Sequence, residues 1–146
     1  MSVPAGAAGF EALTPDVVMD SAERALGRRT SGICRPLTSY INRVYEIGLE
    51  DGGHVIAKFY RPGRWSREAL QDEHDFLREL AADEIPVVAP LADAAGATLH
   101  DEGGICFALF PRMGGRPCDE PSREEWRQIG RLIGRIHAVG ARRPAA

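Results

Sequence analysis

A lysine inside a short apolar segment is the first residue of the sequence that could carry chemistry. In the segment HVIAKFY (residues 54–60), strand alternation places Ile56, Lys58 and Tyr60 on one face. An ammonium group on such a strand costs free energy unless it reaches an anion. The pattern therefore predicts an anion site at Lys58, or alternatively an edge-strand lysine that extends into solvent.

A glutamate in the next segment is the natural partner for this lysine. Apolar residues recur at helical spacing in this segment, at Leu70, Leu77 and Leu80. Glu73 follows the same spacing, so we expect it to interrupt the buried stripe and to require a cation. A strand lysine paired with a glutamate on the next helix is the ion pair that directs a kinase lysine onto nucleotide phosphates. The alternatives are that Glu73 lies at the edge of the stripe, or that Glu68 or Glu79 is the partner.

Two loops give weaker signals. Residues 38–42 (TSYIN) lie between predicted strands and lack a GxGxxG pattern, but Ser39 and Asn42 could meet phosphate oxygens. Residues 110–115 (FPRMGG) follow an apolar strand, where backbone groups could pair with the edge of adenine. The alternatives are that residues 38–42 form an ordinary turn and that residues 110–115 only lead the chain out of the strand.

The elements that must position these residues form an α+β pattern. We expect helices over residues 15–26, 66–82 and 122–139, the first and last capped by Thr14 and Ser122. We expect strands at 32–38, 43–49 and 54–60, and a hairpin of 98–100 and 105–110 across a turn at 101–104. An antiparallel sheet of about five strands with one inserted helix is the layout of a protein-kinase-like amino-terminal lobe.

Composition excludes several classes of function. The net charge is −3 and no basic stripe is present, so nucleic acid is not expected as a partner. The sequence contains no run of about 18 apolar residues, so it predicts no membrane span. Three cysteines without a CxxC pair predict neither a disulfide framework nor a zinc site, and favour a reduced, cytoplasmic setting.

Together these segments resemble the stress response kinase A family of the aminoglycoside-phosphotransferase superfamily. The resemblance runs from about Phe10 to Gly140, and KFYRPGRW followed by a DEH-containing helix is its most specific part. The other stretches that carry it are LTSYINRVYEI (37–47), DEIPVVAPL (83–91) and FALFPRMGGRP (107–117).

The resemblance implies a role for each candidate residue. Lys58 would contact phosphate with Glu73 as its helix partner, and Ser39 and Asn42 would belong to the phosphate-covering loop. The residues implied for the adenine pocket are Val44, Ile56, Phe110 at its back, the Pro111 carbonyl and the Met113 backbone N–H. The implied activity is ATP-dependent phosphorylation of serine or threonine in proteins, with magnesium, in the cytoplasm.

The resemblance also implies a division of the chain. Residues 1–9 read as a disordered tail, 10–112 as a nucleotide-binding small lobe, 111–121 as hinge and linker, and 122–146 as the first helix of an incomplete large lobe. An unpartnered stripe on that helix consists of Trp126, Ile129, Ile133 and Ile136. We expect the stripe to self-associate, and the alternatives are that the helix folds back on the small lobe or frays.

The sequence departs from a complete kinase after the hinge. Phosphoryl transfer needs an aspartate to orient the hydroxyl, and an Asn and an Asp to hold magnesium. Beyond Met113 the sequence has one aspartate, Asp119, and no asparagine. We therefore expect no catalytic residue and no metal ligand in this chain, and we expect the catalytic aspartate downstream of Ala146.

The chain alone is accordingly expected to be inactive. Two alternatives to part of a protein kinase remain. One is a non-catalytic nucleotide- or partner-binding module. The other is part of a kinase for a small molecule of the aminoglycoside, choline or homoserine type.

Overall fold

A five-stranded antiparallel sheet forms the body of the protein. In the computed structural model, the strands are ordered β1-β2-β3-β5-β4. Their bounds are Thr30–Leu37 for β1, Arg43–Leu49 for β2, His54–Phe59 for β3, His100–Glu102 for β4 and Ile105–Pro111 for β5. The predicted α+β class is confirmed.

The structure describes residues 9–115 and 117–144 of the chain. The predicted disordered tail, apart from Gly9, lies outside the described residues. Ala146 lies outside them too. The expectation of a catalytic aspartate downstream of Ala146 is therefore untested by the structure and stays a prediction.

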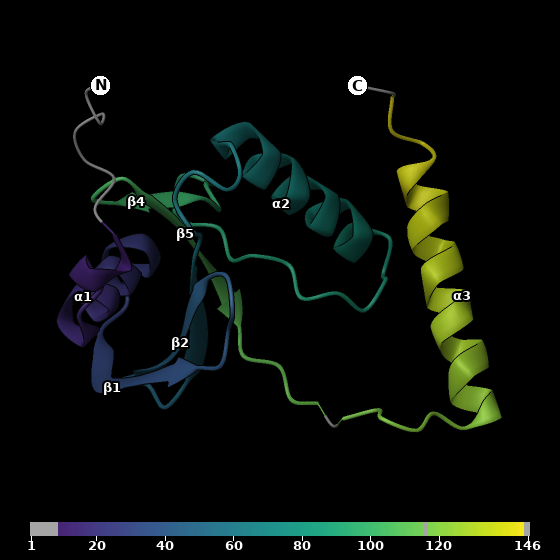
Figure 1. The fold of residues 1–146 in the computed structure, drawn as a ribbon, viewed down its shortest axis with the longest axis horizontal. Helices are drawn as coiled ribbons and strands as arrows, with labels where there is room; N and C mark the ends of the chain where they lie inside the picture. The colour runs from purple at the N-terminus through teal and green to yellow at the C-terminus, as the bar shows by residue number, and fades with distance from the viewer. Residues whose placement is uncertain (1–8, 116, 145–146) are drawn as a thin grey trace.

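Helices cover both faces of the sheet (Figure 1). A short 3-10 turn (Phe10–Ala12) leads into α1 (Pro15–Leu26), and α2 (Arg67–Ala82) follows β3. The main core lies between α1 and the sheet and includes Val18, Ala57 and Phe59, each fully buried. The opposite face of β3 is turned toward α2, as the alternation in the sequence predicts.

The bounds of β4 and β1 differ most from the prediction, while β3 and β5 each end one residue away from it. The β4–β5 turn consists of Gly103 (φ 58°) and Gly104 (φ 88°), whose left-handed backbone suits a two-residue hairpin turn. Strand β4 therefore runs over 100–102, not 98–100, and Glu102 pairs with Ile105. Strand β1 begins early, at Thr30, whose backbone N–H donates to the Glu23 carboxylate at 2.8 Å.

Helix α3 (Arg123–Gly140) stands beyond a long linker, and its carboxyl end rests on α2 (Figure 1). Ser122 and Glu125 form a reciprocal capping box at its start. Val139 is buried against Leu80 and Ile85, with Ile136 packed beside them. The last turns of α3 therefore fold back on the small lobe, one of the expected alternatives to self-association, and this contact covers Ile136.

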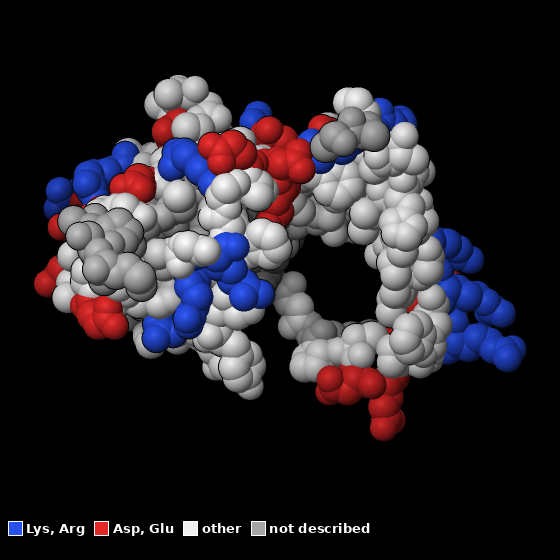
Figure 2. All heavy atoms as spheres, turned by 45° about the horizontal axis from the view of Figure 1, so that its top comes forward, with Lys and Arg blue, Asp and Glu red and all other residues white. Residues whose placement is uncertain are grey.

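An opening lies between the rest of α3 and the body of the protein. Figure 2 shows a wide gap framed by the sheet and α2, the linker, and α3. Trp126 is 60% exposed and Ile133 47% exposed, so these two positions of the predicted stripe remain largely uncovered within the described residues.

Candidate functional site

Lys58 and Glu73 face each other between β3 and α2. Lys58 Nζ lies 3.8 Å from a Glu73 carboxylate oxygen, and Nζ also lies 4.7 Å above the centre of the Tyr60 ring. The prediction that Glu73 interrupts the buried stripe of its helix is wrong, because its side chain is 50% exposed and the buried position is taken by His74. Glu73 instead lies at the edge of the stripe, where its carboxylate reaches Lys58 and remains open to solvent.

A hollow of about 410 Å³ opens beside this ion pair. Its walls come from β3, α2, the extended segment after α2, and the end of β5. Its lining residues are Ile56, Lys58, Glu73, Leu77, Val88, Phe110, Pro111 and Met113. Six of the nine predicted site residues therefore meet at one place, and apart from the ion pair its walls are apolar.

The other three predicted residues do not line the hollow. Val44 stands opposite Lys58 in the register of β2 and β3 and is half-buried. Ser39 is half-buried in the loop before β2. The Asn42 side-chain oxygen accepts from the backbone N–H of Arg61 at 3.1 Å, so this amide already fixes its own loop.

A second contact holds the same loop. The Arg61 Nε donates to the Ile41 carbonyl at 3.1 Å, so one arginine ties residues 41–42 to the chain that leaves β3. These bonds fix the backbone between β1 and β2 above the sheet edge. The loop is thus ordered by side chains and not by glycines.

The hinge end of the hollow is tied to the sheet. Arg112 Nε contacts the Glu46 carboxylate at 2.8 Å, and His54 Nδ1 lies 3.1 Å from the same oxygen. Glu46 is 12% exposed, so its charge is shielded from solvent and held against these two partners. Because Arg112 lies between Pro111 and Met113, the contact restrains the backbone on which those two residues sit.

Three residues at or under the hollow were not among the predicted site residues: Leu77, Val88 and His74. Leu77 and Val88 complete its apolar wall, and Val88 lies in the stretch 83–91, which was singled out only for the resemblance. His74 is fully buried under the site. The signal for His74 was its helical register with Leu70, one turn earlier on the same face.

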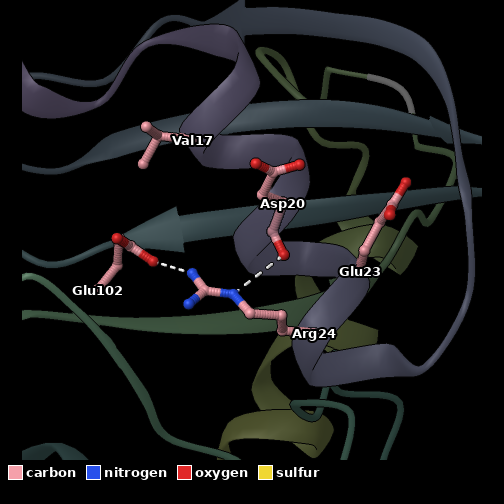
Figure 3. Close-up of a pocket in the computed structure, with 5 residues that line it drawn as sticks. All are labelled: Val17, Asp20, Glu23, Arg24 and Glu102. Atoms are coloured by element: carbon pink, nitrogen blue, oxygen red, sulfur yellow. Dashed lines mark hydrogen bonds and ion pairs between the residues drawn. The ribbon is translucent and has the colours of Figure 1, made fainter.

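A separate hollow of about 420 Å³ lies against α1, where α1 meets β4. Figure 3 shows the Arg24 side chain directed toward Glu102, to which its guanidinium is bonded, with its Nε donating to the Asp20 carbonyl at 3.3 Å. The remaining charged lining groups are the carboxylates of Asp20 and Glu23. Arg24, the cation among the described lining residues, is already paired, so this hollow does not suit a phosphate group.

Comparison with models of known protein families identifies the family of this chain. The model of the phosphotransferase enzyme family, APH, matches residues 33–146. The chain belongs to this phosphotransferase enzyme family. The match covers β2, β3, α2 and β5, which carry the Lys58 hollow, and extends through α3.

Curated relatives of the chain are kinases by name. Stress response kinase A of Salmonella choleraesuis is 42% identical over 135 residues, covering 92% of this chain and 40% of the relative. Stress response kinase A of Escherichia coli K12 is 41% identical over 131 residues, covering 90% and 39%. The predicted resemblance is thus confirmed, and the chain spans about 40% of the length of these relatives.

Solved structures share the fold at low identity. An amicoumacin kinase, solved with AMP-PNP, Ca²⁺ and Ami, superimposes with a TM-score of 0.71 at 21% identity, covering 89% of this chain and 41% of the other. Spectinomycin phosphotransferase, solved with ADP and spectinomycin, gives 0.72 at 11% identity, covering 88% and 39%. Among the described residues, none of the helices combines the length and apolarity that crossing a membrane requires.

Proposed function

We propose that this chain forms the ATP-binding part of a kinase that phosphorylates serine or threonine in proteins. The observation that carries the proposal is the Lys58–Glu73 pair at the mouth of an otherwise apolar hollow. A cation held beside an apolar slot matches a nucleotide, whose phosphates are anionic and whose base is flat and largely apolar on its faces.

The hollow suggests how the nucleotide lies. The phosphates approach Lys58, and the base lies between Ile56 and Met113 with Phe110 at the back. The Pro111 carbonyl and the Met113 N–H pair with the edge of the base. In this proposal Val44 closes the pocket from β2. Backbone N–H groups of the 38–42 loop and the Ser39 hydroxyl meet the phosphates, while Asn42 fixes that loop through Arg61.

The basic residues of the sequence support a special role for Lys58. It is the only lysine of the chain, and every other basic side chain apart from histidine is an arginine. Arginine is a planar, bulky fork, whereas lysine is a compact point charge on a flexible stem. A narrow site between Glu73 and the Tyr60 ring favours the compact charge.

Magnesium would accompany ATP, but the described residues do not fit a magnesium centre. They hold no group of three or more His, Cys, Asp or Glu side chains that could bind a metal. We therefore assign no step to a metal on this chain. Phosphoryl transfer requires aspartates and an asparagine, and we propose that these lie downstream of Ala146, in the part of the relatives that this chain does not cover. We therefore expect the 146 residues alone to be inactive.

The proposal of a protein substrate rests on the relatives. A relative from Salmonella typhimurium, 42% identical over 135 residues, is named serine/threonine protein kinase RdoA. The solved structures with small-molecule names are at most 21% identical and carry the fold alone. We accordingly place the protein in a cytoplasmic stress response, where ATP and protein hydroxyls are available.

Calorimetric titration of ATP into the chain tests the binding proposal. We expect saturable binding that Lys58→Met weakens by about tenfold or more, because the phosphates lose their only lysine. Arg78→Met, which removes an exposed cation from α2 away from the lining of the hollow, is the matched control and should bind as the unaltered chain does. Equal affinity of Lys58→Met and the unaltered chain would place the nucleotide elsewhere.

A further inference from the structure

A buried chain of hydrogen bonds lies directly under the Lys58–Glu73 pair. The Tyr60 hydroxyl and His74 Nε2 are 2.9 Å apart, and His74 Nδ1 and Thr98 Oγ1 are also 2.9 Å apart. All three residues are at most 4% exposed. The chain joins three segments that are distant in sequence: the end of β3, the middle of α2 and the residues just before β4.

His74 is linked to three groups of the proposed nucleotide site: Glu73, the Tyr60 ring and the Phe110 ring. It follows Glu73 directly on α2, so fixing the ring fixes the turn from which the carboxylate projects. Its partner Tyr60 carries the ring under the Lys58 ammonium. On a third side the imidazole meets the Phe110 ring edge-on, with centroids 6.1 Å apart at an angle of 84°.

Packing alone does not call for a histidine at this position. A buried imidazole loses its hydration and is tolerated only when its nitrogens are bonded, whereas a leucine would fill the space without that cost. Fully satisfied buried polar groups instead fix one arrangement of the elements around them. Such a requirement exists here, because a Lys–Glu pair separated by 3.8 Å tolerates little sliding of α2 along β3.

The protonation states agree with a fixed, uncharged relay. Burial lowers the pKa of His74, and the neighbouring Lys58 charge acts in the same direction against the raising effect of Glu73. Burial raises the pKa of Tyr60 well above its ordinary value, with the Glu73 charge adding to the rise. The imidazole is therefore neutral at pH 7 and the phenol keeps its proton, so one ring nitrogen donates and the other accepts.

We propose that His74 is a positioning residue of the nucleotide site, which acts through Tyr60 and Thr98 to hold Glu73 and the Tyr60 ring against Lys58. The inference rests on the proposed function and adds to it a role for three residues that do not line the hollow. In the absence of the relay, α2 still packs through Leu70 and Leu80, but the ion pair loses its fixed geometry.

The single lysine permits a direct readout of this geometry. When an acylating reagent such as acetic anhydride is applied in trace amount, the amines that it can modify are the Lys58 amine and the terminal α-amine, which serves as the internal reference. The Lys58 side chain is 29% exposed, so its contacts with Glu73 and the Tyr60 ring shield the amine from the reagent and slow its acylation. The rate ratio, measured by mass spectrometry without nucleotide, reports the positioning of Lys58 whether or not ATP binds.

Three variants and one control separate positioning from packing. Tyr60→Phe removes the hydroxyl but keeps the ring, and Thr98→Val removes the other hydroxyl. Thr98→Ser restores that hydroxyl. Tyr45→Phe removes a hydroxyl from the opposite, α1-facing side of the same sheet. We expect Tyr60→Phe and Thr98→Val each to speed acylation of Lys58 about threefold and to weaken ATP binding by a similar factor, with Thr98→Ser and Tyr45→Phe unchanged.

The outcomes distinguish this inference from the proposed function. If Lys58 acylation responds as expected but no form of the chain binds ATP, the positioning role stands and the proposed function fails. If the chain binds ATP, yet Tyr60→Phe and Thr98→Val lower only the melting temperature and leave Lys58 reactivity and ATP affinity unchanged, His74 is a packing residue and the inference is overturned.

Discussion

At the scale of single residues, the site depends on a pair of opposite charges that is only partly buried. Lys58 supplies the cation, 29% exposed at the mouth of the hollow, and Glu73 supplies its half-exposed counter-charge. A partly exposed pair of this kind contributes little to stability, so its value lies in where it holds the ammonium. Its loss should therefore affect nucleotide chemistry far more than folding.

Removing either charge should reveal this division in phosphoryl transfer. In a polypeptide that joins this chain to the remaining length of its relatives, Lys58→Met should raise the activation barrier by about 3 kcal/mol. Glu73→Gln should cost less, because the lysine remains. Steady-state kcat/KM for ATP measures both, with Glu68→Gln, on the first turn of α2, as the control. A Lys58→Met enzyme with near-normal turnover would contradict this assignment.

The scale of elements shows what the sequence could and could not predict. Strand β2 and the caps Thr14 and Ser122 follow from local signals, and the structure has them as predicted. Ser66, predicted as the first residue of α2, is the cap that precedes it. The burial of Glu73 was predicted wrongly, because helical spacing gives a stripe but not its edges. Which flank of α2 turns toward Lys58 depends on how the helix packs on the sheet, a tertiary property that periodicity does not contain.

The same limit explains why His74 was missed. A histidine in a charged stretch such as QDEHD resembles a surface residue, and its partners Tyr60 and Thr98 come together only through the fold. Strand β4 was displaced for a local reason, since two glycines suffice for the turn that had been given four residues. Apart from the bounds of β4 and β1, the contacts between elements were therefore what the sequence left open.

Helix α3 gives a test at this scale. Val139, 5% exposed, is the buried contact of α3 with α2, and Arg135 adds bonds to the Asp83 and Glu84 carbonyls at 3.1 Å. A charge at Val139 would be buried without a partner. Val139→Asp should therefore release α3 and leave the sheet intact.

Amide hydrogen exchange measures the two parts separately. Protection in α3 should fall by about tenfold or more, while β2, β3 and β5 keep theirs. Ala138→Asp, at the exposed neighbouring position, should leave both unchanged. If α3 stays protected in Val139→Asp, the packing of its last turns on α2 is not what holds it in place.

At the scale of the whole molecule, the opening beside α3 is the main feature. Figure 2 shows basic side chains along the outer side of α3, away from the opening. The apolar positions Trp126 and Ile133 remain largely exposed, and Ile129 is half-buried. Together they form an apolar stripe of the kind that soluble monomers rarely leave uncovered.

We expect the isolated chain to self-associate through this stripe. Light scattering should give a mass above that of a monomer, falling to monomer mass in the double variant Trp126→Glu with Ile133→Glu. The double variant Gln128→Glu with Arg131→Glu alters exposed positions of the same helix and should still associate. Monomer mass for the unaltered chain at high concentration would show that the stripe is not an association surface.

The proposed function requires that Lys58 contacts the phosphates of a bound nucleotide. Because Lys58 is the sole lysine of the chain, this contact can be measured directly from the acylation rate of its amine. The test compares trace acylation of Lys58 with and without saturating ATP, using the α-amine of the same molecules as reference and adenosine, which lacks phosphates, as the control ligand. We predict that ATP slows acylation of Lys58 by about tenfold, that adenosine has little effect, and that the α-amine is unaffected by either. Acylation of Lys58 at the same rate with and without ATP, under conditions where calorimetry shows ATP to be bound, would contradict the account.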